Sequence, residues 1–472
     1  MKIFREPVAP RGQIFLLPPS VEDYVPGDSA VRIVSEIVDS MDHSGLYAKY
    51  TGGGAPAYDP KIMLKLIVFG YSQGVRSSRR IDAASGQDMR FMFLSEMSHP
   101  DFRTISRFRK ENLEAVNISF RETVRISMEM GLALLEHCSV DGTKLEANVS
   151  GKETYSKDRL EKTLELIDKR IAQILEEADR IEEEEDALYG DARGDELPSE
   201  LKDAIARKKR LEAAKKAMDE AGRHTVGATD TDSRLMKTRS GNKAAYNGQA
   251  VVDKENQVIV AADVVQDETD NRQYAPMMDD VKANTGAKPE KTSGDGGYFS
   301  TESIEYAANE GIDAYIPDTS PKKCPREGFV YEEERDAYIC PEGKALTLCG
   351  ERVNKGLEYR IYRCYRCTGC PRAEACHGKS SRYKEITRRV DDHLQQAMSA
   401  KMKSEEGRSV YRLRKQIVEP VFGNIKANMG MRRLLLRGLE GAKIEYLLAC
   451  TAHNIGKIAR YWIQEKALMI AG

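Results

Sequence analysis

Three carboxylates stand in short motifs that are widely separated along the chain. Asp295 lies in Lys291-Thr-Ser-Gly-Asp-Gly-Gly-Tyr298, which is typical of a strand that runs into a glycine-rich turn. Asp141 lies in the apolar run Cys138-Ser-Val-Asp-Gly-Thr-Lys-Leu145, and Glu419 lies in Arg414-Lys-Gln-Ile-Val-Glu-Pro-Val-Phe-Gly-Asn-Ile-Lys426. A tight turn alone would explain Gly-Asp-Gly-Gly, because aspartate tolerates unusual dihedral angles. Two further carboxylates in comparable settings favour a shared chemical role.

Such carboxylates, if the fold brings them together, are suited to binding two Mg²⁺ ions. Two divalent ions about 4 Å apart activate a water or a 3'-hydroxyl and stabilise the leaving oxygen during phosphodiester attack. Mg²⁺ prefers oxygen ligands and keeps several waters, so three carboxylates suffice. Asp141 and Asp295 can lie on adjacent strands, whereas Glu419 must come from a later helix. Pro420 disfavours helical geometry at the residue before it, so we expect Glu419 at a helix start or kink.

The cysteines form a second set of candidate ligands. Seven of the nine fall between Cys324 and Cys376, and in a cytosolic chain such clustering favours metal binding over disulfides. Two thiolates in a Cys-x2-Cys turn bind one tetrahedral zinc, which a more distant pair completes. The ligand set that fits best consists of Cys340, Cys367, Cys370 and Cys376. The residues that could substitute are Cys364, Cys324 and His377. Reduced cysteines that only pack in a core are the alternative.

Length and composition indicate a soluble protein of several structural units. The chain has 472 residues, of which 40% are apolar and 31% charged. Neither a membrane span of roughly 18 apolar residues nor a signal peptide is recognisable, so we expect a cytoplasmic protein without membrane contact. The net charge of -2 hides local asymmetry, because residues 176–196 are strongly acidic and residues 408–437 strongly basic.

Helical patterns fill the N-terminal part from residue 29 to residue 130. Apolar residues recur there at helical spacing, and Asp59-Pro60 is typical of a helix start. Within Asp101-Phe-Arg-Thr-Ile-Ser-Arg-Phe-Arg-Lys110, the side chains of Arg103, Arg107 and Lys110 share one helical face. This basic face suits contacts with DNA phosphates, and an ordinary solvated surface is the alternative.

The middle of the chain changes to strands. The segment with Asp141 is followed by a long helical hairpin, in which apolar residues between Leu160 and Leu211 follow a coiled-coil-like spacing. Strands at 243–252 and 257–263 form a hairpin, a helix covers 270–283, and a further helix and strand follow Asp295. This order predicts an α/β fold with a central mixed sheet.

These motifs resemble the three catalytic blocks of DDE transposases. The stretches that carry the resemblance are Ser139-Val-Asp-Gly-Thr-Lys-Leu-Glu-Ala-Asn148, Gly294-Asp-Gly-Gly-Tyr-Phe299 and Tyr411-Arg-Leu-Arg-Lys-Gln-Ile-Val-Glu-Pro-Val-Phe-Gly-Asn-Ile-Lys426. The resemblance is to the IS1182-type branch of the IS4/IS5-like insertion-sequence superfamily and spans roughly residues 29–460. It implies an RNase H-like catalytic domain, assembled from residues 131–151, 223–318 and 401–472. It also implies a helical DNA-binding domain (1–130), a helical-hairpin insertion (152–222) and a Cys-rich insertion (319–400).

The resemblance also implies roles for single residues. Asp141, Asp295 and Glu419 would hold two Mg²⁺ or Mn²⁺ ions in each active site. The last block of such families carries a Tyr, Arg, Glu, Lys signature that Tyr411, Arg414, Glu419 and Lys426 match by type. Four residues separate Arg414 from Glu419, where the common pattern has three. The residues expected to contact DNA are Tyr411, Arg414, Lys426, Arg432, Arg433, Arg103 and Arg107.

The resulting prediction is an enzyme that binds insertion-sequence ends and catalyses metal-dependent DNA cleavage and strand transfer. Its partners would be the terminal inverted repeats and target DNA, and the need to bring two ends together implies a homodimer. One alternative is a catalytically silent DNA-binding derivative that holds element ends or represses transposition. A coiled-coil scaffold built on the helical hairpin is another, but it leaves the carboxylates and cysteines unexplained.

Overall fold

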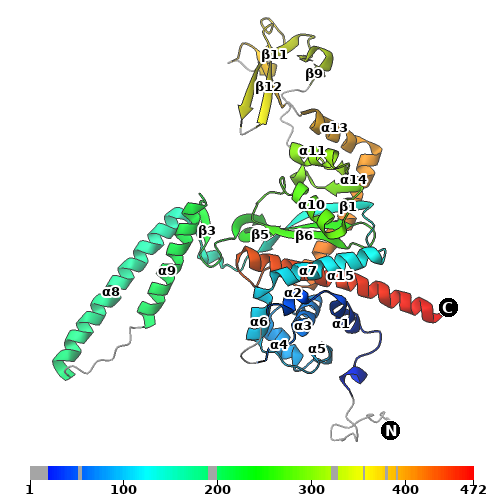
Figure 1. Ribbon diagram of the computed structural model, residues 1–472. Helices are drawn as coiled ribbons and strands as arrows, with labels where there is room; N and C mark the ends of the chain where they lie inside the picture. The colour runs from blue at the N-terminus through cyan, green and yellow to red at the C-terminus, as the bar shows by residue number, and fades with distance from the viewer. Residues whose placement is uncertain are drawn as a thin grey trace, which may run out of the picture.

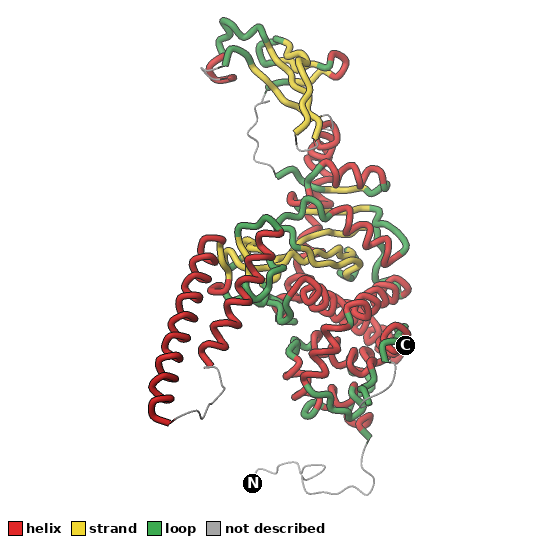
Figure 2. The backbone as a smooth tube through the Cα atoms, turned by 60° about the vertical axis from the view of Figure 1, so that its left-hand side comes forward, coloured by secondary structure: helices red, strands yellow, loops and turns green. Residues whose placement is uncertain are grey.

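The computed structural model describes residues 20–50, 56–189, 199–319, 328–354, 357–377, 381–389 and 392–471. A central sheet occupies the middle of the molecule, with the N-terminal helices on one side of it and a separate small sheet beyond the other side (Figure 1). A pair of long helices projects sideways from the central part, and the view in Figure 2 shows the same separation.

The described residues from 20 to 130 contain seven α-helices, in agreement with the apolar periodicity. They are α1 (Ala30–Ser40), α2 (Ser44–Tyr47), α3 (Pro60–Ser72), α4 (Ser78–Ser85), α5 (Met89–Leu94), α6 (Phe102–Glu111) and α7 (Leu113–Glu129). Helix α3 begins where Asp59 accepts a hydrogen bond from the Lys61 amide, with Pro60 in the first turn. It is buried on nearly all sides because α1, α5, α6 and the C-terminal helix α15 (Gly438–Ala471) pack around it.

The central sheet has six strands. They are β1 (His137–Glu146), β4 (Arg234–Thr238), β5 (Gly241–Asp253), β6 (Ile259–Val265), β7 (Lys291–Gly294) and β8 (Asp313–Tyr315). The strand order is β4-β5-β1-β7-β8, and β6 also pairs with β5. Strands β1, β4 and β6 pair antiparallel with β5, whereas β1, β7 and β8 run parallel. The predicted mixed α/β fold with a helical N-terminal region is therefore confirmed.

Helices from distant parts of the sequence enclose this sheet. Helix α10 (Tyr274–Thr285) packs on β5 and β6, α11 (Thr301–Asn309) on β8, and α14 (Glu405–Gly423) on β1 and β7. Helices α7 and α15 lie side by side between the sheet and the remaining N-terminal helices (Figure 1). One continuous apolar core therefore joins the N-terminal helices to the sheet.

The expectation of a helix start at Glu419 is wrong, whereas the expectation of a kink there stays a prediction. Helix α14 continues through Pro420 to Gly423 and passes into a π-helical turn, η5 (Asn424–Asn428). Proline has no amide hydrogen, so the carbonyl of Gln416, four residues earlier, loses its usual helical partner. The side chain of Gln257 donates a hydrogen bond of 2.9 Å to that carbonyl. This tertiary contact allows the helix to run through the proline.

Two further units extend from the central part. Helices α8 (Lys157–Tyr189) and α9 (Ser199–Glu220) pack against each other. The strand before α8, β2 (Thr154–Ser156), pairs with the strand after α9, β3 (Thr225–Gly227). The second unit is a sheet of β9 (Val330–Glu332), β10 (Ala337–Ile339), β11 (Ala345–Asn354), β12 (Leu357–Cys364) and β13 (Lys384–Arg389), with α12 (Ala373–His377) beside it. Helix α13 (Asp392–Lys403) leads from it to α14.

No helix within the described ranges is both long and apolar enough to cross a membrane.

Candidate active site and DNA-binding surfaces

Asp141, within β1, and Asp295, directly after β7, lie next to each other in the interior of the central sheet. Strands β1 and β7 run parallel, with Val140 opposite Gly294. Asp141 follows Val140 and Asp295 follows Gly294, so the two aspartates are neighbours. One oxygen of Asp141 accepts a hydrogen bond from the Gly142 amide (2.9 Å), and the other accepts one from Arg414 (2.9 Å). Asp295 caps the short helix η3 (Gly296–Tyr298) by accepting from the Gly297 amide.

Burial and a neighbouring carboxylate disfavour the ionised form of Asp141. Burial raises the pKa of Asp141 to about 6, the Arg414 guanidinium opposes this rise, and the charge of Asp295 adds to it. A divalent cation between the two aspartates would relieve both the desolvation and the repulsion. The chemistry of this pair of oxygen donors therefore fits Mg²⁺ or Mn²⁺.

We expect the free energy of unfolding of the metal-free protein to fall as the pH rises from about 4 to 6, the range between the pKa of Asp141 in the unfolded and in the folded chain. The folded chain keeps this proton up to pH about 6, whereas the unfolded chain releases it near 3.8. Because the folded state binds more protons in that window, the free energy of unfolding falls as the pH rises from about 4 to 6. Urea unfolding in EDTA measures this slope. Over this pH range, the free energy of unfolding of the wild type should fall by about 2 to 3 kcal/mol more than that of Asp141→Asn. The same pH dependence of this free energy in both proteins would contradict the prediction.

The residues expected to contact DNA from the last block occupy different environments. Arg414 is buried and forms its ion pair with Asp141, and the Tyr411 ring lies 5.8 Å from its guanidinium carbon. Lys426 donates to the carbonyl of Lys144 (2.9 Å), and burial together with Arg239 and Arg432 lowers its pKa to about 8. Arg433 donates to two backbone carbonyls after β1, and the side chain of Arg432 is exposed.

Glu419 does not join the two aspartates in a group that could hold a metal ion. Helix α14 packs on the sheet through a face that includes Arg414, Val418 and Val421, whereas the side chain of Glu419 is exposed. Its proposed role as a metal ligand stays a prediction. Across the described part of the chain, no group of three or more His, Cys, Asp or Glu side chains lies close enough together to hold a metal ion.

A carboxylate that the sequence analysis did not single out lies beside the aspartate pair. Asp270 precedes α10, and its Oδ1 accepts hydrogen bonds from Asn247 (2.6 Å) and Gln249 (2.7 Å). The Lys144 ammonium lies 3.8 Å from the same oxygen. Asp270 stands in no glycine-rich turn, so no local pattern distinguishes it from other aspartates near helix starts.

The predicted basic face of α6 borders a concave surface. A cavity of about 640 Å³ lies between the start of α4 and α6, and Arg79, Arg103, Arg107 and Lys110 line it together with Ser77 and Ser78. These four basic side chains are exposed. Leu435, from the loop before α15, also lines the cavity, so this surface reaches the segment that follows the last motif.

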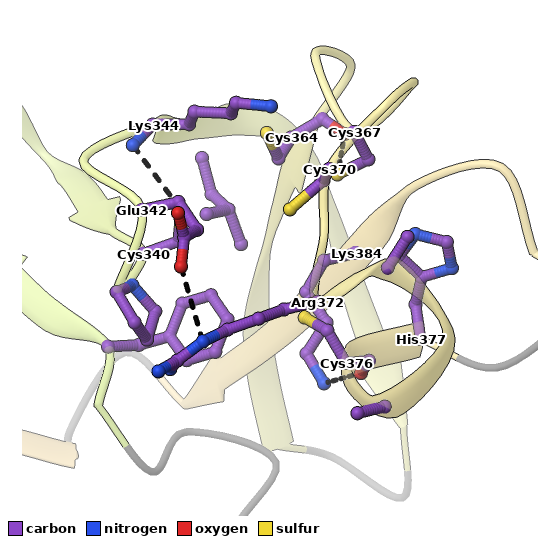
Figure 3. Close-up of a pocket in the computed structure, with 15 residues that line it drawn as sticks. Cys340, Glu342, Lys344, Cys364, Cys367, Cys370, Arg372, Cys376, His377 and Lys384 are labelled. Atoms are coloured by element: carbon purple, nitrogen blue, oxygen red, sulfur yellow. Dashed lines mark hydrogen bonds and ion pairs between the residues drawn. The ribbon is translucent and has the colours of Figure 1, made fainter.

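The predicted zinc ligands face one cavity in the small sheet. A space of about 350 Å³ is lined by Cys340, Cys364, Cys367, Cys370, Cys376 and His377 (Figure 3). The Lys344 amide donates to the Cys340 sulfur (3.3 Å), and the Cys370 amide donates to the Cys367 carbonyl. The structure thus gathers the predicted set without closing it into a coordination shell. Cys324 lies outside the described residues.

Two family models match separate parts of the chain. A family described as a transposase DDE domain matches residues 339–459, and the transposase domain DUF772 matches residues 19–111. These two matches together are the combination typical of IS1182-type transposases. The first match includes Glu419, while Asp141 and Asp295 lie outside both. No curated protein and no solved structure gives a significant match.

Proposed function

We propose that this transposase binds insertion-sequence ends and catalyses metal-dependent cleavage and transfer of DNA strands. The observation that supports this most is the juxtaposition of Asp141, within β1, and Asp295, directly after the parallel neighbouring strand β7. A structural scaffold has no need for a carboxylate whose pKa is raised by burial next to a second carboxylate.

Asp141, Asp295 and Glu419 would hold two Mg²⁺ ions, with Mn²⁺ as a substitute. The bound ions supply activation of the attacking oxygen and stabilisation of the leaving oxygen. Arg414 fixes the orientation of Asp141 through its 2.9 Å contact, and it compensates part of the negative charge at the centre. Lys426, Arg432 and Arg433 would hold phosphates of the element end nearby.

A cleavage assay tests this proposal. A labelled duplex that carries the flanking inverted repeat is incubated with wild type or Asp295→Asn, with Mg²⁺ or with EDTA. Cleavage or strand transfer that requires both Mg²⁺ and Asp295, while DNA binding survives the substitution, supports the transposase. Specific binding without metal-dependent cleavage by wild type would favour a silent DNA-binding derivative. Cleavage that survives the substitution would mean that the active site lies elsewhere.

The helical N-terminal region up to residue 130 would supply a second DNA contact through its basic cavity. We expect Arg103→Ala combined with Arg107→Ala to weaken duplex binding and to reduce the slope of log K against log salt by about 2, because each phosphate contact contributes about 0.9. Fluorescence anisotropy at several salt concentrations measures this slope. Lys202→Ala with Lys209→Ala removes two exposed charges of α9 as a matched control. If both double variants show the same dependence of log K on log salt, then α6 does not contact DNA phosphates.

The cysteine cavity would hold one structural zinc ion. We expect zinc in a one-to-one ratio by elemental mass spectrometry, and its loss with a lower melting temperature in Cys367→Ser combined with Cys370→Ser. Cys349→Ser is the matched control, because Cys349 is an exposed cysteine of the same sheet outside the cavity. Wild-type protein that is free of zinc after purification without chelators would support the packing alternative.

Paired ends require two catalytic chains, so the active form would be a homodimer. Light scattering of the protein alone and with inverted-repeat DNA measures this stoichiometry. A single chain on paired ends would contradict it.

A further inference from the structure

We propose that the tip of the β4–β5 hairpin, residues 237–243, binds the phosphate backbone of the DNA duplex about five base pairs from the cut. This inference rests on the proposed function. It adds a DNA contact that lies outside the three motifs and outside α6.

The hairpin tip is a two-stranded ribbon that continues beyond the other strands of the central sheet. Pairing of β5 with β1 ends at Ala245, and pairing with β6 ends at Asn247, so residues 241–244 pair with β4 alone among these strands. Gly241 follows the turn with a φ of 99°, a conformation that favours glycine. A two-stranded ribbon has a width that fits the major groove of B-DNA.

The hairpin tip carries three exposed basic side chains, those of Lys237, Arg239 and Lys243. Lys243 lies opposite Met236, so Lys237 and Lys243 are on opposite faces of the ribbon, and Arg239 is in the turn between the strands. A ribbon with positive charge on both faces can contact phosphates on both sides of a groove.

These basic side chains have no acidic partner. Within the part of the chain that the structure describes, none of the three forms an ion pair or a side-chain hydrogen bond, and the same holds for the side chain of Arg432. Like charges that are held together without counter-charges repel one another, so this surface is suited to binding a polyanion.

Hydrogen bonds hold the hairpin tip beside Lys426 and Arg432. The Ser240 hydroxyl donates to Glu146 at the end of β1 (2.6 Å), and the Glu146 amide donates to the Arg432 carbonyl (3.1 Å). Burial and, after it, the charges of Arg239 and Arg432 lower the pKa of Lys426 to about 8, so these three cations are neighbours. The hairpin tip therefore extends the basic surface of the last motif.

Strand β1 sets the distance between this surface and the aspartate pair. Glu146 follows Asp141 by five residues on β1. A strand rises about 3.3 Å per residue, so these two residues lie about 17 Å apart. Successive base pairs of B-DNA are about 3.4 Å apart along the axis. For a duplex that runs along β1 with its scissile phosphate at Asp141 and Asp295, the hairpin tip would meet phosphates about five base pairs from the cut.

Salt-dependent binding of the full-length protein to a labelled duplex with the flanking inverted repeat tests this inference. The tip variant combines Lys237→Ala, Arg239→Ala and Lys243→Ala. We expect the slope of log K against log salt to decrease in magnitude by about 2 to 3, because each phosphate contact contributes about 0.9. Fluorescence anisotropy at several salt concentrations measures this slope.

The matched control combines Lys202→Ala, Arg207→Ala and Lys209→Ala. It removes the same three charges from exposed positions of α9 and should leave the slope as in wild type. An equal decrease in the control and in the tip variant would reduce the hairpin tip to a general contribution of charge and overturn the proposal.

Ethylation interference on the same duplex locates the contact. Ethylation of phosphates about five nucleotides from the cut should weaken binding of wild type, and the tip variant should lose this interference while keeping that at other phosphates. The same interference pattern in both proteins would overturn the proposal. Should the tip variant not fold, as judged by circular dichroism, Arg239→Ala alone is compared with wild type by the same two measurements.

Asp295→Asn separates this inference from the proposed function. If Asp295→Asn loses cleavage while the tip variant binds the duplex with the slope and interference pattern of wild type, the hairpin tip is not a DNA contact and the proposed function stands. If wild type neither binds the duplex specifically nor cleaves it, the proposed function fails and this inference fails with it.

Discussion

Asp141→Asn is expected to lower metal-dependent DNA cleavage by about a thousandfold or more at pH 8. Asparagine keeps the shape of the side chain, and its one oxygen can still accept from either the Gly142 amide or Arg414, which bond different oxygens of Asp141. It removes the negative charge that attracts a divalent ion, and metal stabilisation of the transition state contributes several kcal/mol, at about 1.4 kcal/mol for each factor of ten in rate. Single-turnover cleavage of a labelled inverted-repeat duplex measures the rate, and anisotropy verifies that the duplex still binds.

Asp263→Asn is the matched control for this prediction. Asp263 is also an aspartate of the central sheet, but it lies on β6, two strands from β1, and forms a partly exposed ion pair with Lys443. We expect its rate to stay within about threefold of wild type. A comparable loss of rate in both variants would point to general destabilisation of the sheet, and full activity of Asp141→Asn would exclude Asp141 from the chemistry.

Glu445→Gln is expected to destabilise the folded protein by about 3 to 5 kcal/mol, because it leaves buried charges without their partner. Glu445 is completely buried near the start of α15 and lies 3.9 Å from Arg76 and 3.8 Å from Arg109. It also accepts from Tyr71 and from the amides of Leu435 and Leu436. This single carboxylate therefore joins α3 and α6 to the loop that follows the last catalytic motif.

Urea unfolding measures the loss, and the pair between Lys443 and Asp263 again provides the control. The side chains of that pair are 31% and 29% exposed, so Lys443→Met should cost less than about 1 kcal/mol. Replacing Glu445, Arg76 and Arg109 together by methionine should restore part of the stability, since no buried charge then remains unpaired. If Glu445→Gln and Lys443→Met lower the free energy of unfolding equally, then the burial of Glu445 does not make its ion pairs more important for stability.

The sequence predicted the elements of this protein well where local patterns are strong. Apolar periodicity indicated the N-terminal helices, and the β5–β6 hairpin and the strand before Asp295 followed from apolar runs bounded by turn residues. The glycine-rich turn indicated that Asp295 ends a strand. The resemblance to transposases was also visible in the sequence alone, because its three motifs are contiguous stretches, and the two family matches agree with it.

Only the tertiary structure decided which side chains meet. Pairing of β1 with β7 sets the register that brings Asp141 to Asp295, and no pattern within either strand specifies that register. Gln257, more than a hundred residues away, satisfies the carbonyl that Pro420 leaves free, so helix α14 continues where local preference predicted a break. Asp270 lies beside the two aspartates because two amide side chains on β5 donate hydrogen bonds to it. Spacing along the chain therefore determined the elements and the class, whereas contacts between distant residues determined the composition of the site.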